Sequence, residues 1–385
     1  MKKVVRLFFV VTFVVFSTIS LLHSPINAEV IELTDNDYDD FAPQINNDGN
    51  VVWYGQEGGS DWRVFLYDGT TTTQLPEDSY DDGGPQINDA GYIVWCGKEV
   101  DGGDYEIFLY DGTETKQLTD NDYDDRIPQI NNAGDVVWIR GDGGNNTEIF
   151  FYDGTTETTT RLTNNNYCDE KPQINNAGDV VWQGAEGGND TEIFFYDGTA
   201  TTQLTYDTYN DSDPQINDAG DIVWQRYDGT DWEVILYDGS TMKELTNNGY
   251  DDQNPQINDP GDIVWQRHDG TDWEIFLYDG STITQLTSND YDDAGPQMND
   301  SGYIVWRGKE GGNDDEIFLY DGTETTQLTD NDYEDWTPQI NNAGNIVWSG
   351  YDGNDWEVFL YRSASGGSGG GGGSGGCFID TLFCK

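Results

Sequence analysis

The chain has 385 residues and a formal net charge of −56, because 73 aspartates and glutamates outnumber 17 lysines and arginines. Such a negative charge repels nucleic acid and anionic membranes, which excludes both as partners and favours cations or basic ligands. Aromatic residues make up 14% of the chain, with 13 tryptophans and 23 tyrosines. The polar composition therefore still leaves enough apolar surface for a folded core.

The first 28 residues have the pattern of a secretory signal peptide. Lys2, Lys3 and Arg6 precede an apolar run over residues 7–22, and Ala28 is a suitable last residue before cleavage. The run is short for a bilayer span of ~20 residues. We therefore expect cleavage and a secreted, periplasmic or cell-surface protein with no integral membrane domain afterwards. An uncleaved membrane anchor is the alternative.

The rest of the chain is dominated by a unit of about 42 residues that occurs eight times. Its clearest marker is Pro-Gln-Ile-Asn, which becomes Pro-Gln-Met-Asn in the seventh unit. So regular a period predicts small modules that bury their apolar faces only by stacking on their neighbours. The marker begins at Pro43, Pro85, Pro128, Pro172, Pro214, Pro255, Pro296 and Pro338.

The unit over residues 205–246 shows the strands that we expect in each repeat. Residues 214–217 are extended, residues 221–225 and 232–237 are β-branched and aromatic, and residues 241–246 form a fourth strand. A turn with Gly220 joins the first two strands, and Asp238-Gly239 favours a tight hairpin between the last two. No helical periodicity interrupts the pattern.

Four short antiparallel strands in each of eight units predict an all-β fold, an eight-bladed β-propeller over residues 29–362. Residues 30–34 match a fourth strand, whereas the last unit stops near Arg362 without one. The N-terminal strand can therefore complete the last blade and remove two exposed edges. An open solenoid is the alternative. A tryptophan recurs in the second strand of each unit, and we expect it to lie in the core between blades. These tryptophans are Trp53, Trp95, Trp138, Trp182, Trp224, Trp265, Trp306 and Trp348.

The order Leu-Thr, acidic loop, Pro-x-Ile-Asn, Gly, Val-Val-Trp and Glu-Ile-Phe-Leu-Tyr-Asp-Gly resembles the TolB-type (WD40-like) propeller repeat. The resemblance covers residues 30–362. Asn-Asp-Ala-Gly turns stand where that family has Ser-Pro-Asp-Gly, so the chain resembles a divergent member. The resemblance implies a propeller and a scaffold role, but no reaction.

The acidic residues concentrate in loops that the strand order places on one face. One Asp, three residues before each Pro, recurs in every unit, and we expect it to hold the loop by accepting backbone hydrogen bonds. These are Asp40, Asp82, Asp125, Asp169, Asp211, Asp252, Asp293 and Asp335. The other acids suit a solvated surface or calcium, which binds six to eight oxygens. The calcium candidates are Asp35, Asp37, Asp39, Asp120, Asp122, Asp124, Asp330 and Asp332; no other cofactor is expected.

The repeats mark no catalytic constellation. After cleavage His268 is the only histidine, which leaves no histidine pair for a nucleophile or a metal. We therefore predict that the chain is not an enzyme. The expected function is a monomeric, non-catalytic binding or scaffold ring outside the cytoplasm, whose acidic face takes a cationic partner, a protein or peptide, or a glycan. A structural cell-surface component and a polysaccharide-active enzyme are the alternatives.

The last 23 residues form a separate tail. Residues 363–376 are almost all glycine and serine, which predicts a flexible linker. The end that follows, with Cys377-Phe378-Ile379 and Cys384, resembles a C-terminal tail of exported bacterial proteins that sorts or attaches them. Cys377 and Cys384 are able to close a small loop in an oxidising compartment.

Overall fold

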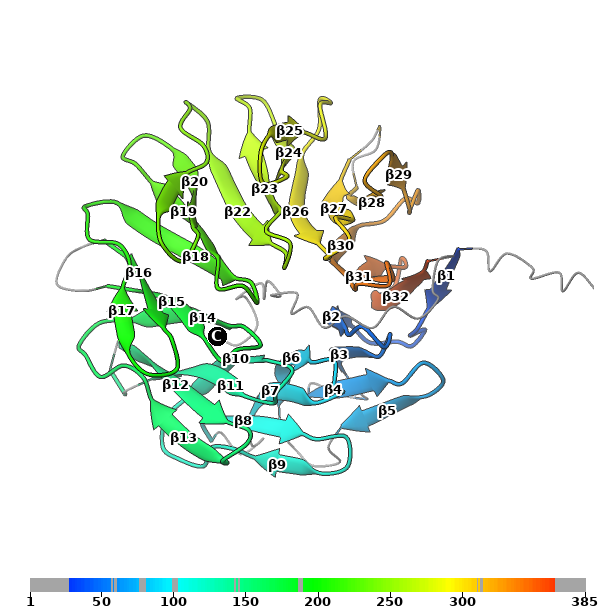
Figure 1. Cartoon of the computed structure of the whole chain (residues 1–385). Helices are drawn as coiled ribbons and strands as arrows, with labels where there is room; N and C mark the ends of the chain where they lie inside the picture. The colour runs from blue at the N-terminus through cyan, green and yellow to red at the C-terminus, as the bar shows by residue number, and fades with distance from the viewer. Residues whose placement is uncertain are drawn as a thin grey trace, which may run out of the picture.

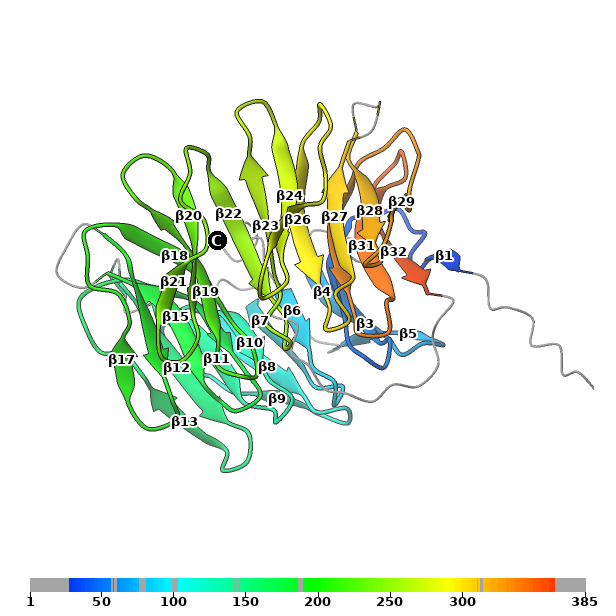
Figure 2. The ribbon, with the colours of Figure 1, turned by 45° about the horizontal axis from the view of Figure 1, so that its top comes forward.

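The computed structural model describes residues 28–363, except 57, 59–60, 76–80, 99–102, 142, 145, 186–189, 310 and 312–313. In this part of the chain there are strands and turns but no helix. Eight four-stranded antiparallel sheets form a ring (Figure 1). The tilted view shows the sheets standing side by side around a common axis (Figure 2). The prediction of an all-β, eight-bladed propeller is confirmed.

Each blade contributes its strands in the same order from the channel outward. The innermost strands are β2 (Asp40–Ile45), β6 (Gly83–Ile87), β10 (Asp125–Ile130), β14 (Asp169–Ile174), β18 (Asn210–Ile216), β22 (Asp252–Ile257), β26 (Asp293–Met298) and β30 (Asp335–Ile340). The second strands are β3 (Val51–Gln56), β7 (Ile93–Lys98), β11 (Val136–Gly141), β15 (Val180–Gly184), β19 (Ile222–Tyr227), β23 (Ile263–His268), β27 (Ile304–Gly308) and β31 (Ile346–Tyr351).

In the first seven blades an Asp-Gly turn joins the two outer strands into a hairpin, whereas in the eighth blade the outermost strand comes from the N-terminal end of the described chain. The third strands are β4 (Trp62–Tyr67), β8 (Tyr105–Tyr110), β12 (Thr147–Asp153), β16 (Glu192–Tyr196), β20 (Trp232–Tyr237), β24 (Trp273–Tyr278), β28 (Glu316–Tyr320) and β32 (Trp356–Arg362). The outermost strands are β5 (Thr72–Leu75), β9 (Thr115–Gln117), β13 (Thr158–Arg161), β17 (Thr201–Gln203), β21 (Met242–Glu244), β25 (Ile283–Gln285), β29 (Thr325–Gln327) and β1 (Glu29–Glu32).

The N-terminal strand β1 is the fourth strand of the eighth blade. It pairs antiparallel with β32, with Ile31 opposite Leu360 and Glu32 opposite Phe359. Just beyond the strand, the Leu33 amide donates to the Val358 carbonyl at 2.8 Å. This closure was predicted from the sequence, and it protects edges that would otherwise be open to other chains.

The core lies between the blades rather than within them. All eight recurrent tryptophans are at most 1% exposed. In seven blades the indole stacks on a phenylalanine of the third strand, with ring centroids 5.6–5.9 Å apart. One seam shows the pattern: Val223 of the fifth blade packs with Ile263 and Trp265 of the sixth. Each seam therefore buries apolar surface from two blades, as the stacking argument requires.

The Asn of Pro-Gln-Ile-Asn closes the ring a second time. In each blade its side-chain amide donates to the backbone carbonyl of the same Asn in the next blade. The last link runs from Asn341 to Asn46 at 2.8 Å. Its side-chain oxygen also accepts backbone amides of the turn that follows, as at Asn217 from Asp221 at 2.8 Å. The sequence showed this residue in every unit without revealing this role.

Substitution of one member of this ring tests its contribution to stability. We expect Asn217→Ala to lower the free energy of unfolding by about 2 kcal/mol, because it removes several buried hydrogen bonds. Asn247→Ala, on the exposed loop nearby, serves as the control and should change stability by less than about 0.5 kcal/mol. Urea denaturation measures both. Equal effects would mean that the ring of amides adds nothing.

The parts of the chain predicted to be processed or flexible are mostly outside the described residues. The signal-peptide prediction is represented only by Ala28, and the tail prediction only by Ser363. Cys377 and Cys384 also lie outside. Among the described residues there is no apolar helix long enough to cross a membrane.

Candidate functional site

A bulge interrupts the innermost strand of every blade, immediately before the Pro of the repeat. The pairing with the second strand skips two residues there, as between Phe41 and Gln44. The residue before Pro then adopts a positive φ, from 48° at Ala42 to 63° at Gly295. Six of the eight residues are not glycine: Ala42, Ile127, Lys171, Asp213, Asn254 and Thr337.

A left-handed backbone costs an L-residue about 1–2 kcal/mol relative to glycine. Gly84 and Gly295 occupy the same position in two blades, so the fold accepts glycine there. The other six blades keep a side chain in spite of the strain. Ile127 and Thr337 are even β-branched, which makes a positive φ especially unfavourable. Strain retained at equivalent positions makes these side chains candidates for a functional role.

The same bulge is where the repeats differ most. Between the buried Asp and Pro-Gln, both of which occur in every unit, lie two residues that change from blade to blade. The first has eight identities in eight blades: Phe41, Gly83, Arg126, Glu170, Ser212, Gln253, Ala294 and Trp336. The second has seven: Ala42, Gly84, Ile127, Lys171, Asp213, Asn254, Gly295 and Thr337. We call these sixteen residues the variable ring. The variable ring is visible in the sequence as the two positions that differ between repeats, but a list of the residues shared by all repeats does not contain it.

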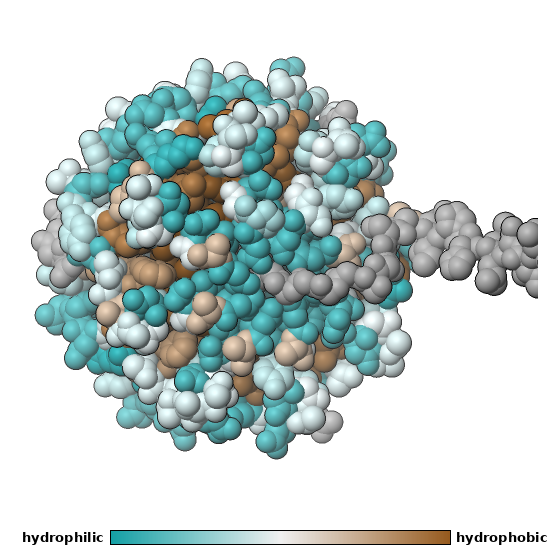
Figure 3. Space-filling view, in the orientation of Figure 1, coloured by the Kyte–Doolittle hydropathy of each residue, from teal (hydrophilic) through white to brown (hydrophobic). Residues whose placement is uncertain are grey.

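The variable ring borders a cavity of about 340 Å³ in the central channel. The cavity is lined by the residue before Pro in blades three to eight, by the following Pro-Gln segments and by Arg307. The space-filling view shows a mainly hydrophilic face, with hydrophobic residues gathered between its middle and its upper-left edge (Figure 3). A second cavity of about 90 Å³ is lined by the linked Asn residues of the Pro-Gln-Ile-Asn segments, among them Asn46, Asn88 and Asn341. The channel is thus wider at the end where the repeats differ.

Charged side chains enter the wide end from three blades. The Lys171 ammonium pairs with the Asp213 carboxylate, which also accepts a hydrogen bond from the Gln225 side chain at 3.0 Å. The Gln183 side chain of the fourth blade accepts a hydrogen bond from the backbone amide of Asp213 at 2.9 Å. Arg307 pairs with Asp315 at 2.7 Å and lines the cavity from another side. The mouth therefore offers both signs of charge within an acidic protein.

Where the eighth blade meets the first, two aromatic residues of the variable ring, Phe41 and Trp336, lie against two tryptophans of the third strands. Trp336 and Trp356 have ring centroids 4.5 Å apart, and Phe41 lies 5.6 Å from Trp356 and 6.0 Å from Trp62. Trp336 is 40% exposed. We call Phe41, Trp62, Trp336 and Trp356 the aromatic platform. An exposed, stacked indole offers a contact surface for an apolar or cationic group.

The eight recurrent aspartates lie in the seams, at most 3% exposed. In seven blades the indole of the recurrent Trp donates to this Asp, as from Trp265 to Asp252 at 2.6 Å. In six joining loops an Asn side chain donates as well, as from Asn289 to Asp293 at 2.7 Å. These donors are side chains, whereas the sequence had suggested backbone amides.

Seven of these aspartates face a glutamate that is the first or second residue of the third strand in the preceding blade. The pairs are Glu357–Asp40, Glu106–Asp125, Glu148–Asp169, Glu192–Asp211, Glu233–Asp252, Glu274–Asp293 and Glu316–Asp335. Burial is the main cause that raises the pKa of Glu357 to about 7 and that of Asp40 to about 6. Burial and the neighbouring Glu316 likewise raise the pKa of Asp335 to about 7.

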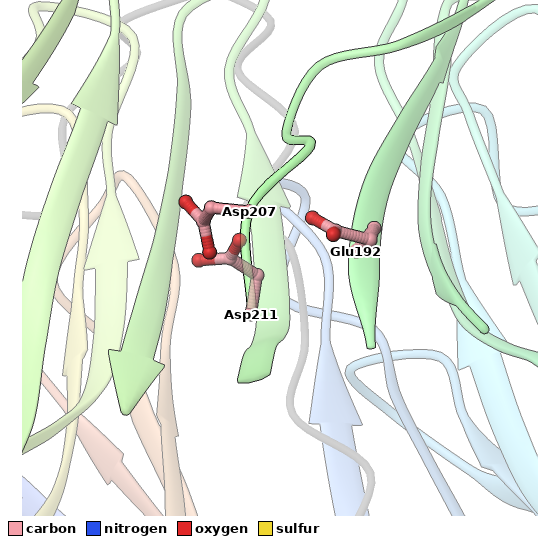
Figure 4. Close-up of side chains that lie close together, drawn as sticks. All are labelled: Glu192, Asp207 and Asp211. Carbon is pink, nitrogen blue, oxygen red and sulfur yellow. The ribbon is translucent and has the colours of Figure 1, made fainter. Parts of the chain in front are cut away.

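The eight calcium candidates occupy the joining loops of blades one, three and eight. Asp35, Asp37, Asp120, Asp122, Asp330 and Asp332 are exposed, and Asp39 and Asp124 are half-buried. The Asp39 carboxylate accepts the Trp356 amide at 3.2 Å, and Asp124 accepts the Tyr105 amide at 3.0 Å. The structure brings together other acids, in two triads: Glu192, Asp207 and Asp211 (Figure 4), and Asp269, Asp272 and Glu274. Calcium binding by the eight candidates stays a prediction.

His268, the histidine of the described residues, is not arranged for catalysis. Its ring lies 5.3 Å from that of Trp273, and Nδ1 accepts the Gly270 amide at 3.3 Å. Its place at the end of β23 is that of Tyr227 at the end of β19.

The fold and the channel define this chain as a β-propeller with a variable channel mouth. No family model matches the sequence, and no curated protein matches it. Solved structures do match in fold. The β-propeller domain of the Trilobed protease from Pyrococcus furiosus, described as having an open velcro topology, is 12% identical. The match covers 76% of this chain and 98% of that one, with a TM-score of 0.56.

Two further matches differ in how much of the other protein they cover. The Porphyromonas gingivalis dipeptidyl peptidase 4 is 10% identical, with 80% of this chain and 57% of that one covered and a TM-score of 0.57. An oligogalacturonate lyase in complex with manganese is 15% identical, with 87% and 93% covered and a TM-score of 0.53. Identities this low show the fold alone. The chain spans a little under 60% of the length of the acylaminoacyl peptidase and the dipeptidyl peptidase.

These matches correct the expected function. A non-catalytic binding or scaffold ring was predicted, but the similar propellers are those of peptidases and of a lyase. The absence of catalytic residues from the repeat does not separate a free-standing binding ring from a propeller that accompanies a hydrolase. A propeller that serves as one domain of a peptidase needs none, since its catalytic domain is separate. The resemblance to the TolB type in particular finds no support beyond the propeller itself.

Proposed function

We propose that this chain is a hydrolase-associated propeller: the variable ring selects a peptide substrate at the wide end of the channel, and a separate catalytic unit cleaves it. The observation that carries this proposal is the variable ring itself. Two residues differ in nearly every blade, within a frame of Asp and Pro-Gln that does not change. Where a scaffold is held constant and one position varies, that position sets specificity rather than stability.

The chemistry of the ring suits a polypeptide better than a uniform polymer. Around the mouth it presents an alkyl group at Ile127, an ion pair at Lys171 and Asp213, an amide at Asn254 and a hydroxyl at Thr337. The aromatic platform adds a flat apolar surface. A chain of varied side chains can match such a set, whereas a polyuronate offers one repeated charge. The peptidase names among the fold neighbours agree with this choice.

The location and lineage follow as part of the same proposal. The basic and apolar start of the sequence supports export, and the acidic surface suits basic peptides outside the cytoplasm. The repeat order supports a divergent TolB-type relationship. Detection of the mature N-terminus near Glu29 by mass spectrometry of the exported protein would test the first point.

Glycine substitutions at strained positions separate specificity from folding. In Thr337→Gly the relief of backbone strain offsets the greater flexibility of glycine in the unfolded chain, so we expect a stability within about 1 kcal/mol of the parent. Ile127→Gly also loses the packing of Ile127 against the cluster around Trp182, so we expect it to be less stable by about 1–2 kcal/mol. We expect at least a tenfold loss in affinity for peptides that the parent binds. Fluorescence anisotropy with a labelled mixed-sequence peptide library, beside thermal melts, measures both. Tyr209→Ala, on an exposed joining loop, is the control.

Two outcomes would contradict the proposal. If the glycine variants bind peptides as the parent does, the variable ring does not select substrate. If the parent binds oligogalacturonate and no peptide, the lyase relationship is the better guide.

A tagged protein recovered from its own cells should carry a separate unit that hydrolyses peptides. The rate of hydrolysis should fall when a competing peptide that binds the variable ring is added.

A further inference from the structure

One loop position separates the seam between blades four and five from the six seams in which an Asn approaches the buried Asp. The second blade also has an acid at this position, Asp78, which lies outside the described residues, but there Arg63 replaces the facing glutamate. In six seams an Asn of the joining loop donates its side-chain amide to the buried Asp. These are Asn36, Asn121, Asn165, Asn248, Asn289 and Asn331. The fifth blade has Asp207 instead. A donor is thereby replaced by a third carboxylate beside Glu192 and Asp211.

The three carboxylates converge from two blades. Glu192 begins β16 of blade four, whereas Asp207 and Asp211 flank the start of β18 in blade five. Figure 4 shows the Glu192 side chain extending toward the other two. One carboxylate oxygen from each residue lies within 4.8 Å of the other two. Oxygen atoms so grouped are able to share one cation.

One cation of the protein is already present, but it does not balance the site. Arg226 Nε lies 2.8 Å from Asp211, and its Nη2 lies 3.1 Å from Asp207. Arg140 and Arg267 make the same contact with Asp125 and Asp252 in seams that have Asn121 and Asn248. Those seams hold two carboxylates and one guanidinium, whereas this one holds three and one. The arginine is thus shared by three seams, and among these three the third carboxylate is particular to this one. The Glu–Asp pairs without an arginine, such as Glu274–Asp293, carry the same net charge of −2 on two carboxylates.

A second observation points to a missing ligand. Glu192 is 5% exposed, and its Oε2 atom has no hydrogen-bond partner. The same atom lacks a partner at Glu274, Glu316 and Glu357, but an Asn stands beside those glutamates, whereas Glu192 has the third carboxylate of Asp207 beside it. A buried carboxylate oxygen without a partner is unfavourable. In the seams with an Asn, the backbone amide of that Asn donates a hydrogen bond to the facing glutamate, as from Asn248 to Glu233 at 2.7 Å. The Asp207 side chain is 36% exposed, so the cluster is open to solvent on one side.

We propose that Glu192, Asp207 and Asp211 bind one divalent cation of the oxygen-preferring class, calcium or magnesium, and that this cation joins blades four and five. The cation would bring the local charge from −2 to zero and would satisfy the Glu192 oxygen. Water would complete a coordination shell of six to eight oxygens. The site is at a seam outside the channel cavity, so it is independent of substrate selection by the variable ring.

The chain supplies its own matched variants for the test. Asp207→Asn restores the residue of six other seams and should fold normally. Asn248→Asp creates the same three acids and one arginine in the next seam. Calcium and, separately, magnesium are titrated into EDTA-stripped protein at pH 8 and 0.15 M NaCl, with isothermal calorimetry and melting temperature as readouts. Surface acids contribute equally to all three proteins.

We expect a saturable calcium site in the parent whose affinity falls at least tenfold in Asp207→Asn, and one site more than the parent has in Asn248→Asp. The melting temperature of the parent should rise with calcium more than that of Asp207→Asn. A response that Asp207→Asn keeps in full, or an Asn248→Asp protein that gains no site, would overturn this ligand set. Peptide binding by the variable ring is measured separately, so a failure here leaves the proposed function standing.

Discussion

Lowering the pH from 8 to 5.5 should make this protein more stable, by on the order of 5 kcal/mol in the free energy of unfolding. The cause is the set of carboxyl pairs in the seams. Burial raises the pKa of Glu192, Glu233, Asp335 and Glu357 to about 7, and that of Glu106 to about 6. Asp40, Asp169 and Asp293 are also raised to about 6, mainly by burial.

The sign follows from proton binding. In the unfolded chain these groups have pKa values near 4, so between about pH 4 and 7 the folded state holds more protons. Stability is therefore complete at the acidic end of this range and is lost as the pH rises through 6 to 7. The turn aspartates behave oppositely: hydroxyl and backbone donors lower the pKa of Asp68 to about 2. They titrate below this window and leave the trend unchanged.

Thermal melts across pH 5.5–8 measure the effect, which should be about 5–10 °C for a domain of this size. High salt distinguishes its source. At 1 M NaCl the Debye length is about 3 Å, so repulsion between surface acids is screened while buried pairs are not. A melting temperature that is flat with pH, or a dependence that vanishes in 1 M NaCl, would show that the seam carboxylates are ionised without penalty.

The fold could be predicted because the repeat constrains it at several levels. The period gave the number of blades, Asp-Gly gave the outer hairpins, and residues 30–34 matched the strand that the last unit lacked. The strand at residues 232–237 matches β20, while the expected fourth strand at 241–246 shortens to β21, residues 242–244. An outermost strand has a partner on one side only, so pairing ends sooner at its exposed edge.

The site could not be predicted in the same way, because its information lies in differences between repeats. The bulge before each Pro, and the positive φ at Lys171 or Thr337, do not follow from residue type, since neither residue favours that conformation. Likewise, Pro-Gln-Ile-Asn was understood as a marker, but the link from Asn341 to Asn46 joins residues 295 positions apart. Only the closed ring brings them together.

The recurrent aspartates look alike in sequence but fall into two classes, which the residue two places after Trp distinguishes. After Trp265 that residue is Arg267, which pairs with Asp252 through Nε at 2.7 Å and Nη2 at 3.2 Å. After Trp306 it is Gly308, where an added Cβ would lie 2.0 Å from an Asp293 oxygen. The carboxylate of Asp293 therefore occupies the space that a side chain would need.

Asp252→Ala should therefore destabilise the protein far more than Asp293→Ala at pH 8. Removing Asp252 leaves the Arg267 guanidinium without its carboxylate partner, and the Arg267 side chain is only 18% exposed. The Trp265 indole also loses its hydrogen-bond acceptor. Breaking such a buried ion pair costs about 3–5 kcal/mol. Removing Asp293 frees the Trp306 indole from its acceptor but also removes a carboxylate that burial disfavours. We expect a loss of about 1 kcal/mol there.

Urea denaturation of the two variants at pH 8 compares matched positions in adjacent blades. Repeating it at pH 5.5 adds a second contrast. The Asp293 carboxyl group, whose pKa burial raises to about 6, is partly protonated and stabilising there, so the loss in Asp293→Ala should grow as the pH falls. Equal losses at pH 8 would mean that the arginine does not distinguish the seams. That result would also weaken the charge argument for the triad at Asp207, because that argument counts Arg226 as a fixed neutralising charge.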